Sequence, residues 1–173
     1  MVTKNKTLLI LSTAGATLLL LAVATAGLTT TIFAQQNFNR FTAKLSGSNE
    51  VPPVTTAGSG IAVFHLLPVG HQEVLNYELD LKNIKGVTGA HIHSGKQGKN
   101  GPVVAGLFNQ PRGPPTGTIN GLLTAGTLTS SQLTGPLTHK TIDSLVNMIK
   151  SGDAFVNVHT TQNQNGEVRG HIS

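Results

Sequence analysis

The 173-residue chain contains no cysteine. This absence excludes disulfide bonds, catalysis by a thiolate and metal sites with cysteine ligands. Any exported part of the protein must therefore be held together by its hydrophobic core alone. A domain of about 135 residues is long enough to bury one such core.

The chain also lacks a cluster of basic residues. Removing Lys4 and Lys6, which belong to an N-terminal segment, leaves 12 − 2 = 10 Lys and Arg against 7 Asp and Glu, so the remainder carries about +3. These basic residues are scattered and have no interleaved aromatic residues, so we expect no nucleic-acid partner. No Ser-His-Asp arrangement, phosphate-cradling loop or nucleophile elbow is present. The sequence thus names no catalytic residue, and we expect a non-catalytic protein.

The N-terminal segment is apolar from Leu8 to about Ala34 and follows Lys4 and Lys6. This pattern is typical of a signal peptide, with small residues for cleavage after residue 26 or 34. The run is also long enough to span a bilayer with the lysines on the cytoplasmic side. We therefore predict a signal peptide or membrane anchor at 1–34 and an exported domain at 38–173. If the segment is not cleaved, the membrane is a partner and the domain faces outside.

The remainder of the chain is typical of short strands separated by Gly- and Pro-rich turns. Leu75, Tyr77, Leu79 and Leu81, for example, share one face of an alternating segment. We expect strands at 38–45, 60–66, 74–81, 87–93, 102–108, 154–160 and 166–172, with weak strand or coil at 118–123. Two prolines make 51–54 an edge or an extended crossing segment.

One helix is expected at 141–150, where apolar residues recur at helical spacing and Gly152 follows the C-terminal end. Short, mostly antiparallel strands with a single helix indicate a mainly β fold, either an antiparallel β-sandwich or a barrel.

The histidines are the main functional signal. His91 and His93 are two residues apart, so in a strand their side chains point to the same face. His159 lies on a later predicted strand, and imidazole is the commonest metal ligand. His93 and His159 each end a strand before a polar loop that closes with Asn-Gly. The sequence therefore predicts a candidate metal site made of His91, His93 and His159.

Three stretches resemble the CHRD domain, a module named after chordin and common in microbial exported proteins. They are FTAKLSGSNEVPPV at 41–54, GAHIH with NGPVV within 89–104, and FVNVHT with GEVRG within 155–170. The resemblance extends from about residue 41 to 172. Gln164 departs from it, because the family usually has a proline before this turn. The resemblance implies an immunoglobulin-like β-barrel and no settled biochemical activity.

The resemblance also implies a distant similarity to copper–zinc superoxide dismutases. In those enzymes a His-x-His strand supplies two copper ligands and a later strand supplies another, an order that His91, His93 and His159 match. Arg169 would take the place of an anion-guiding arginine. However, residues 94–138 contain no histidine that could bridge copper and zinc, the zinc loop is unrecognisable, and the cysteine pair is missing. The similarity thus implies a three-histidine copper site with an open position, not full dismutase activity.

A second interpretation stays open. His91 and His93 are then half-buried strand residues that hydrogen-bond to loop backbone and fix the ends of a hairpin. In that case the protein is a structural or interaction domain at the cell surface, and its protein or surface partner is unknown.

The other histidines are predicted to lie apart from this group. His65, His71 and His139 belong to separate segments, so we expect them at the surface. His171 shares strand parity with Arg169 and could join the group, although solvent exposure is favoured for it.

Glu50 and Glu167 suggest a pair of carboxylates for acid–base catalysis. We favour a structural role for both, as partners of Arg169 or of turn amides.

Overall fold

The computed structural model describes residues 40–111 and 117–173; the predicted signal or anchor segment at 1–34 lies outside them. In the described ranges eight strands form one antiparallel sheet. Their bounds are β1 Arg40–Ser46, β2 Ser59–Val69, β3 Gln72–Lys85, β4 Val87–Ser94, β5 Val103–Asn109, β6 Thr118–Leu128, β7 Ala154–Thr160 and β8 Val168–His171. Within these ranges no helix is both long and apolar enough to cross a membrane.

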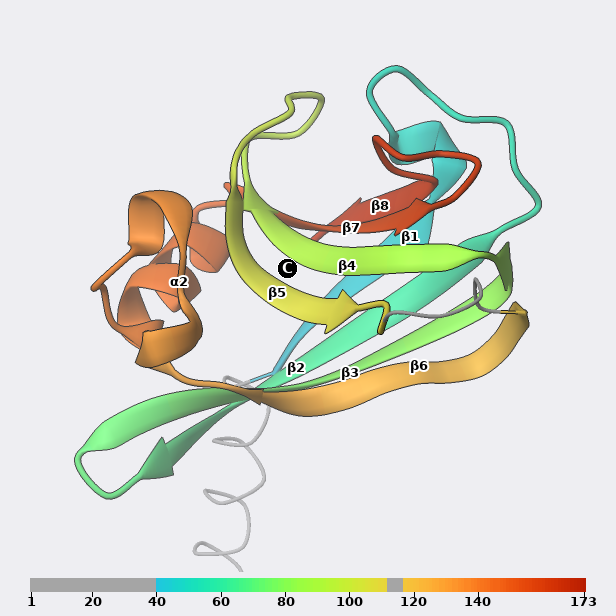
Figure 1. Ribbon diagram of the computed structural model, residues 1–173. Helices are drawn as coiled ribbons and strands as arrows, with labels where there is room; N and C mark the ends of the chain where they lie inside the picture. Colours follow the sequence, from blue (N-terminus) through green and yellow to red (C-terminus); the bar gives the residue numbers. More distant parts are fainter. Residues whose placement is uncertain (1–39, 112–116) are drawn as a thin grey trace, which may run out of the picture. The chain divides into compact units, whose positions relative to one another are not determined.

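The sheet curls into a nearly closed barrel. Its strand order is β5-β4-β7-β8-β1-β2-β3-β6, and Figure 1 shows the first four strands curving over the last four. The two edge regions are linked by the Tyr77 hydroxyl on β3, which donates to the Leu107 carbonyl of β5 at 2.8 Å. Thr124 of β6 donates to the same carbonyl at 3.5 Å.

The core fills the inside of this barrel. Alternate residues of each strand point inward, as Ala90 and Ile92 do on β4 and Val156 and Val158 do on β7; all four are fully buried. Burying apolar area of this kind is the main stabilising contribution in a chain without disulfides. The intervening residues of β4 and β7 direct their side chains to the opposite face, outside this core.

Helix α2 (Ile142–Lys150) lies at one end of the barrel, against β3 and β7. Ile142, Leu145, Val146 and Ile149 form its buried stripe, and Lys150 lies in its last turn. Gly152 takes a positive φ of 74° just beyond the helix, which favours glycine.

The predicted mainly β fold with one helix is confirmed, and the structure defines several elements more closely. The weak segment at 118–123 is a full strand, β6, and β2 and β3 are both longer than expected. Residues 51–54 lie outside the strands. Three short 3₁₀ helices were not predicted: Gly47–Asn49, Ser130–Gln132 and Gly135–Leu137.

Candidate metal centre

The three predicted histidines come from two adjacent strands. In the β4–β7 ladder Gly89 pairs with His159, and His93 pairs with Phe155. His91 lies between them on β4, so the three imidazoles share the face of the sheet that points away from Ala90 and Ile92.

The three rings converge. Ring centroids are 5.2 Å apart for His91 and His159, 5.8 Å for His93 and His159, and 5.9 Å for His91 and His93. One nitrogen from each ring lies within 4.8 Å of the others, and 4.8 Å divided by √3 places all three within about 2.8 Å of a common point. Metal–imidazole bonds are roughly 2.0–2.1 Å long, so small ring adjustments would complete a site.

Loop carbonyls fix two of these rings. His93 Nδ1 is 2.9 Å from the Gly101 carbonyl oxygen, and His159 Nδ1 is 3.0 Å from that of Gln164. Because a carbonyl oxygen only accepts, Nδ1 must carry the proton in both rings. Nε2 is then left with a free lone pair. Among residues 40–111 and 117–173, both Nε2 atoms are buried and have no hydrogen-bond partner.

His91 is held through its other nitrogen. Its ring hydrogen-bonds to the Asn109 side chain at the end of β5. The buried Nδ1 atom has no partner in the described part of the chain, so the contact with Asn109 uses Nε2. When Nε2 donates to the amide oxygen, the lone pair lies on Nδ1. The cluster thus offers one Nδ1 and two Nε2 donors, each supported by a second hydrogen bond, as metal-binding histidines usually are.

The electrostatics keep these rings neutral. Burial lowers the pKa of His91 and of His93, and it lowers the pKa of His159 to about 4. Only a neutral imidazole can bind a metal ion. At neutral pH the three donors are therefore available without the loss of a proton.

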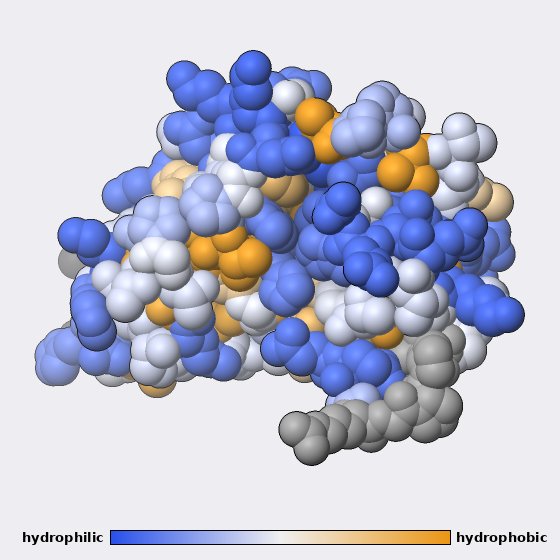
Figure 2. Space-filling model, turned by 45° about the horizontal axis from the view of Figure 1, so that its top comes forward, coloured by the Kyte–Doolittle hydropathy of each residue, from blue (hydrophilic) through white to orange (hydrophobic). Residues whose placement is uncertain are grey.

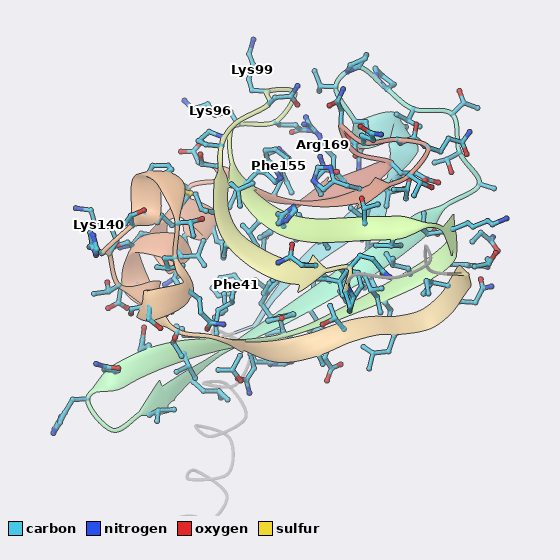
Figure 3. All side chains as sticks on the ribbon, in the orientation of Figure 1. Phe41, Lys96, Lys99, Lys140, Phe155 and Arg169 are labelled. Carbon is cyan, nitrogen blue, oxygen red and sulfur yellow. The ribbon has the colours of Figure 1, made fainter. Side chains whose placement is uncertain are left out.

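Arg169 and Phe155 support the cluster from the side. Figure 3 shows the two side chains close together, whereas Lys96 and Lys99 point outward from the loop after β4. The Phe155 ring stacks on His93 at 5.2 Å with an interplanar angle of 13°, and the Arg169 guanidinium lies 4.6 Å from the Phe155 centroid.

Arg169 is almost fully buried, with 1% of its surface exposed. Its Nε donates to the Asn49 carbonyl at 2.6 Å, and Nη1 donates to Asn100 Oδ1 at 2.8 Å. The guanidinium therefore ties the loop after β1 and the loop after β4 to β8. These contacts give Arg169 a structural role in the described structure.

A hollow of about 230 Å³ lies beside the cluster, between residues 50–54 and 162–166. Glu50 lines this hollow, and only 5% of the residue is exposed. Burial raises the pKa of Glu50 to about 7, although Arg169 and the Val51 amide act in the opposite direction. The loop face turned forward in Figure 2 is mostly hydrophilic, with small separate hydrophobic patches.

Glu50 and Glu167 have separate partners: Glu50 interacts with Arg169 and accepts a hydrogen bond from the Val51 amide. Glu167 accepts hydrogen bonds from the Thr56 and Thr160 hydroxyls, both at 2.8 Å. Glu50 therefore has the expected kind of partners, Arg169 and a backbone amide, whereas the partners of Glu167 are threonine hydroxyls and not those expected.

His65, His71 and His139 are exposed as predicted. His171 is half-buried, so the solvent exposure favoured for it is observed only in part. Its ring lies 5.6 Å from Phe155, and Nε2 is buried because the last strand packs against β7. In the described ranges only His91, His93 and His159 form a group that could hold a metal ion.

The sequence did not indicate Asn109 or the two carbonyls that hold the rings. Asn109 is one of several asparagines at strand ends, and backbone acceptors have no residue-type signature. The repeated Asn-Gly loops after His93 and His159 were the available signal, since both carbonyls belong to these loops.

Fold and site together define a single-sheet β-barrel domain with a half-buried three-histidine group on its outer face. The model of the CHRD domain family matches residues 41–172, most of the chain, and the protein belongs to this family. Neither the curated proteins nor the solved structures contain a significant match. The similarity to superoxide dismutases therefore remains a prediction from the sequence.

Proposed function

We propose that this CHRD domain binds one copper ion outside the cell through His91 Nδ1, His93 Nε2 and His159 Nε2. One observation carries the proposal: three neutral imidazoles converge, and in the described structure each has a buried nitrogen without a hydrogen-bond partner. A buried polar atom without a partner is costly, and a metal ion would satisfy all three at once.

Copper is favoured by the donor set. Imidazole suits copper and zinc alike, but Cu²⁺ binds most tightly among the divalent first-row metals. Three protein ligands leave a fourth position open for water or a small ligand. The protein then acts as a copper-binding module, and the sequence names no residue for further chemistry.

The proposed location is the cell exterior. The match to the CHRD family supports it, because these domains occur in secreted or extracellular proteins. The basic and apolar pattern of residues 1–34 supports it independently, as a signal peptide or an uncleaved anchor. In the anchored form the copper site faces outward.

Copper titration of the chelator-treated chain tests the metal proposal. We expect one equivalent of Cu²⁺ to bind, with an electron paramagnetic resonance signal showing nitrogen ligands. The double variant His91→Ala with His159→Ala should lose this uptake, whereas His65→Ala with His139→Ala, which removes two exposed histidines, should retain it. Equal copper uptake by both double variants would overturn the proposed site. Tighter binding of Zn²⁺ than of Cu²⁺ would overturn the choice of copper as the metal.

A second candidate function rests on the hydrogen bonds of His93 and His159 to Gly101 and Gln164. In this reading the imidazoles hold the two loops, and the loops contact a partner at the cell surface. The thermal midpoint distinguishes the two, because a bound ion stabilises the folded state by mass action. The copper proposal predicts a higher midpoint with Cu²⁺, and the architectural one predicts no change.

A further inference from the structure

The hairpin of β2 and β3 projects beyond the barrel. The two strands pair as far as Val69 and Gln72. The neighbouring ladders stop earlier, at Arg40–His65 on the β1 side and at Leu75–Leu128 on the β6 side. Past these pairs the hairpin has no neighbouring strand in the described structure, and Figure 1 shows it extending away from the rest of the sheet.

On its β2 side the end of this hairpin is apolar and exposed, whereas its β3 side carries His71, Gln72 and Glu73. Leu67 is 41% exposed and Val69 is 58% exposed, with Pro68 between them. Residues 66–72 contain no Lys, Arg, Asp or Glu. Isolated two-stranded ribbons are marginally stable in water, and apolar side chains gathered at a projecting tip often mark an interaction site.

The course of the chain indicates what this tip meets. Arg40, the first residue of β1, pairs with His65 of β2. β2 continues past His65 to the hairpin tip, so the tip and the start of β1 lie at the same end of the sheet. The apolar run 8–34 ends six residues before Arg40. Six residues of fully extended chain span at most about 20 Å. The tip lies four residues beyond His65, roughly 13 Å at the rise of a strand.

We infer that the tip, residues 67–69, inserts into the surface of the lipid bilayer in which residues 8–34 are anchored. This inference rests on the anchored form of the proposed function. The tip reaches past Arg40 toward the end of the chain that carries the anchor, and its side chains suit the boundary between headgroups and acyl chains.

This arrangement orients the histidine cluster. Ser46, at the other end of β1, pairs with Arg169, which in turn pairs with Asn157 opposite His91. Ser46 is six residues from Arg40, roughly 20 Å along the strand. With the tip in the bilayer, two attachments hold the domain, and the copper site is directed away from the membrane.

The absence of cysteine makes a direct test available. Val69→Cys in the full chain is labelled with an environment-sensitive fluorophore, and the protein is reconstituted into phosphatidylcholine–phosphatidylglycerol vesicles with or without lipids that carry a nitroxide quencher. Leu122→Cys is the matched control, since Leu122 is an apolar residue with 59% exposure. Across the sheet Leu122 pairs with Asp80, Asp80 with Ile61, and Ile61 with Lys44. Leu122 therefore lies at the level of Lys44, which is farther from the hairpin tip than Arg40 is.

For Val69→Cys we expect blue-shifted emission and loss of about half of it to the quencher, as for a side chain about 5–10 Å into the headgroup boundary. Leu122→Cys should show neither effect. Equal, water-like emission at both positions in vesicle-bound protein would overturn the inference and leave the anchor intact. Release of the chain from the vesicles by alkaline washing would also overturn the proposal that residues 8–34 anchor the chain in the bilayer.

A second copy of the chain is the alternative occupant of the tip. It would give disulfide-linked dimers of unlabelled Val69→Cys and no quenching of the labelled protein, which would also overturn the inference. Copper uptake by the same preparation is measured separately, so failure of the hairpin contact and failure of metal binding are distinguishable.

Discussion

His93 and His159 are held in the same way: each donates Nδ1–H to a carbonyl in the loop after its own strand, Gly101 at 2.9 Å and Gln164 at 3.0 Å. Both rings therefore keep a lone pair on a buried Nε2 that has no hydrogen-bond partner in the described structure. His91 differs, because its Nε2 contacts Asn109 and its Nδ1 is the free nitrogen. The histidine cluster is thus held by two loops and the end of β5, besides the two strands that carry the imidazoles.

The contact between Asn109 and His91 predicts that Asn109 contributes to copper binding. Asn109→Ala should weaken Cu²⁺ binding by about 10–100-fold, because loss of a supporting hydrogen bond frees the ring to rotate and changes its tautomer. Asn76→Ala is the control, since this asparagine accepts a hydrogen bond from Thr127 on a distant pair of strands. Competitive titration against a copper chelator measures both affinities. Equal affinities would show that Asn109 does not position His91.

Gly101 is predicted to be irreplaceable in the loop after β4. A Cβ atom at this position would lie 1.7 Å from the Ser94 carbonyl oxygen, so the loop must move and the hydrogen bond to His93 must change. Gly101→Ala should destabilise the fold by about 1–3 kcal/mol and weaken copper binding. Gly106→Ala on β5 is the control, because its nearest contact would be an ordinary 3.8 Å. Urea unfolding followed by circular dichroism compares the two, and equal stabilities would contradict the prediction.

Most strands and the helix could be predicted because their periodicity is strong. The alternation at 74–81 and the apolar stripe at 142–149 reflect burial of one face, and both appear where expected. The exposed parts were harder to predict. β6 lies at an edge of the sheet and is mostly exposed, so it lacks alternation, and Pro68 and Gly70 obscure the extension of β2 to the hairpin tip.

The site could be predicted in so far as the alternation of side chains along a strand determines which histidines share a face. His91 and His93 had to share a face, and His159 joined them because β4 and β7 are neighbours in the sheet. The strand order itself depends on pairings between distant segments, which local periodicity does not encode. The loop carbonyls and the packing of Arg169 against Phe155 depend on the same long-range geometry.

Arg169 should not tolerate lysine. Its guanidinium reaches Asn49 and Asn100 with two different nitrogens while lying over Phe155, and a lysine has a single nitrogen. We expect Arg169→Lys to destabilise the fold by about 2–4 kcal/mol, as loss of contacts by a buried charge does. The exposed Arg40→Lys should stay within about 0.5 kcal/mol of the original protein. Equal urea midpoints for the two variants would contradict this role.

The last prediction concerns the pH dependence of stability in metal-free protein. Burial raises the pKa of Glu50 from 4.5 to about 7, so between these pH values the folded state binds more protons than the unfolded state. Its contribution to stability is therefore lost as the pH rises from 4.5 through 7. The pKa of His159 is lowered from 6.5 to about 4, so its contribution rises with pH over 4 to 6.5. The two effects oppose each other between pH 4.5 and 6.5.

Glu50→Gln removes one of these opposing effects and keeps the other. The stability of the variant relative to the original protein should increase from pH 5 to pH 8, by at most about 3 kcal/mol at 1.36 kcal/mol per pKa unit. Urea unfolding at a series of pH values, with a chelator present, measures this difference. Glu78→Gln, at an exposed position on β3, is the matched control for the removal of one carboxylate. A profile for Glu50→Gln parallel to that of the original protein would show that the Glu50 carboxyl is already ionised in the folded state at pH 5, because its contacts with Arg169 and the Val51 amide outweigh the effect of burial.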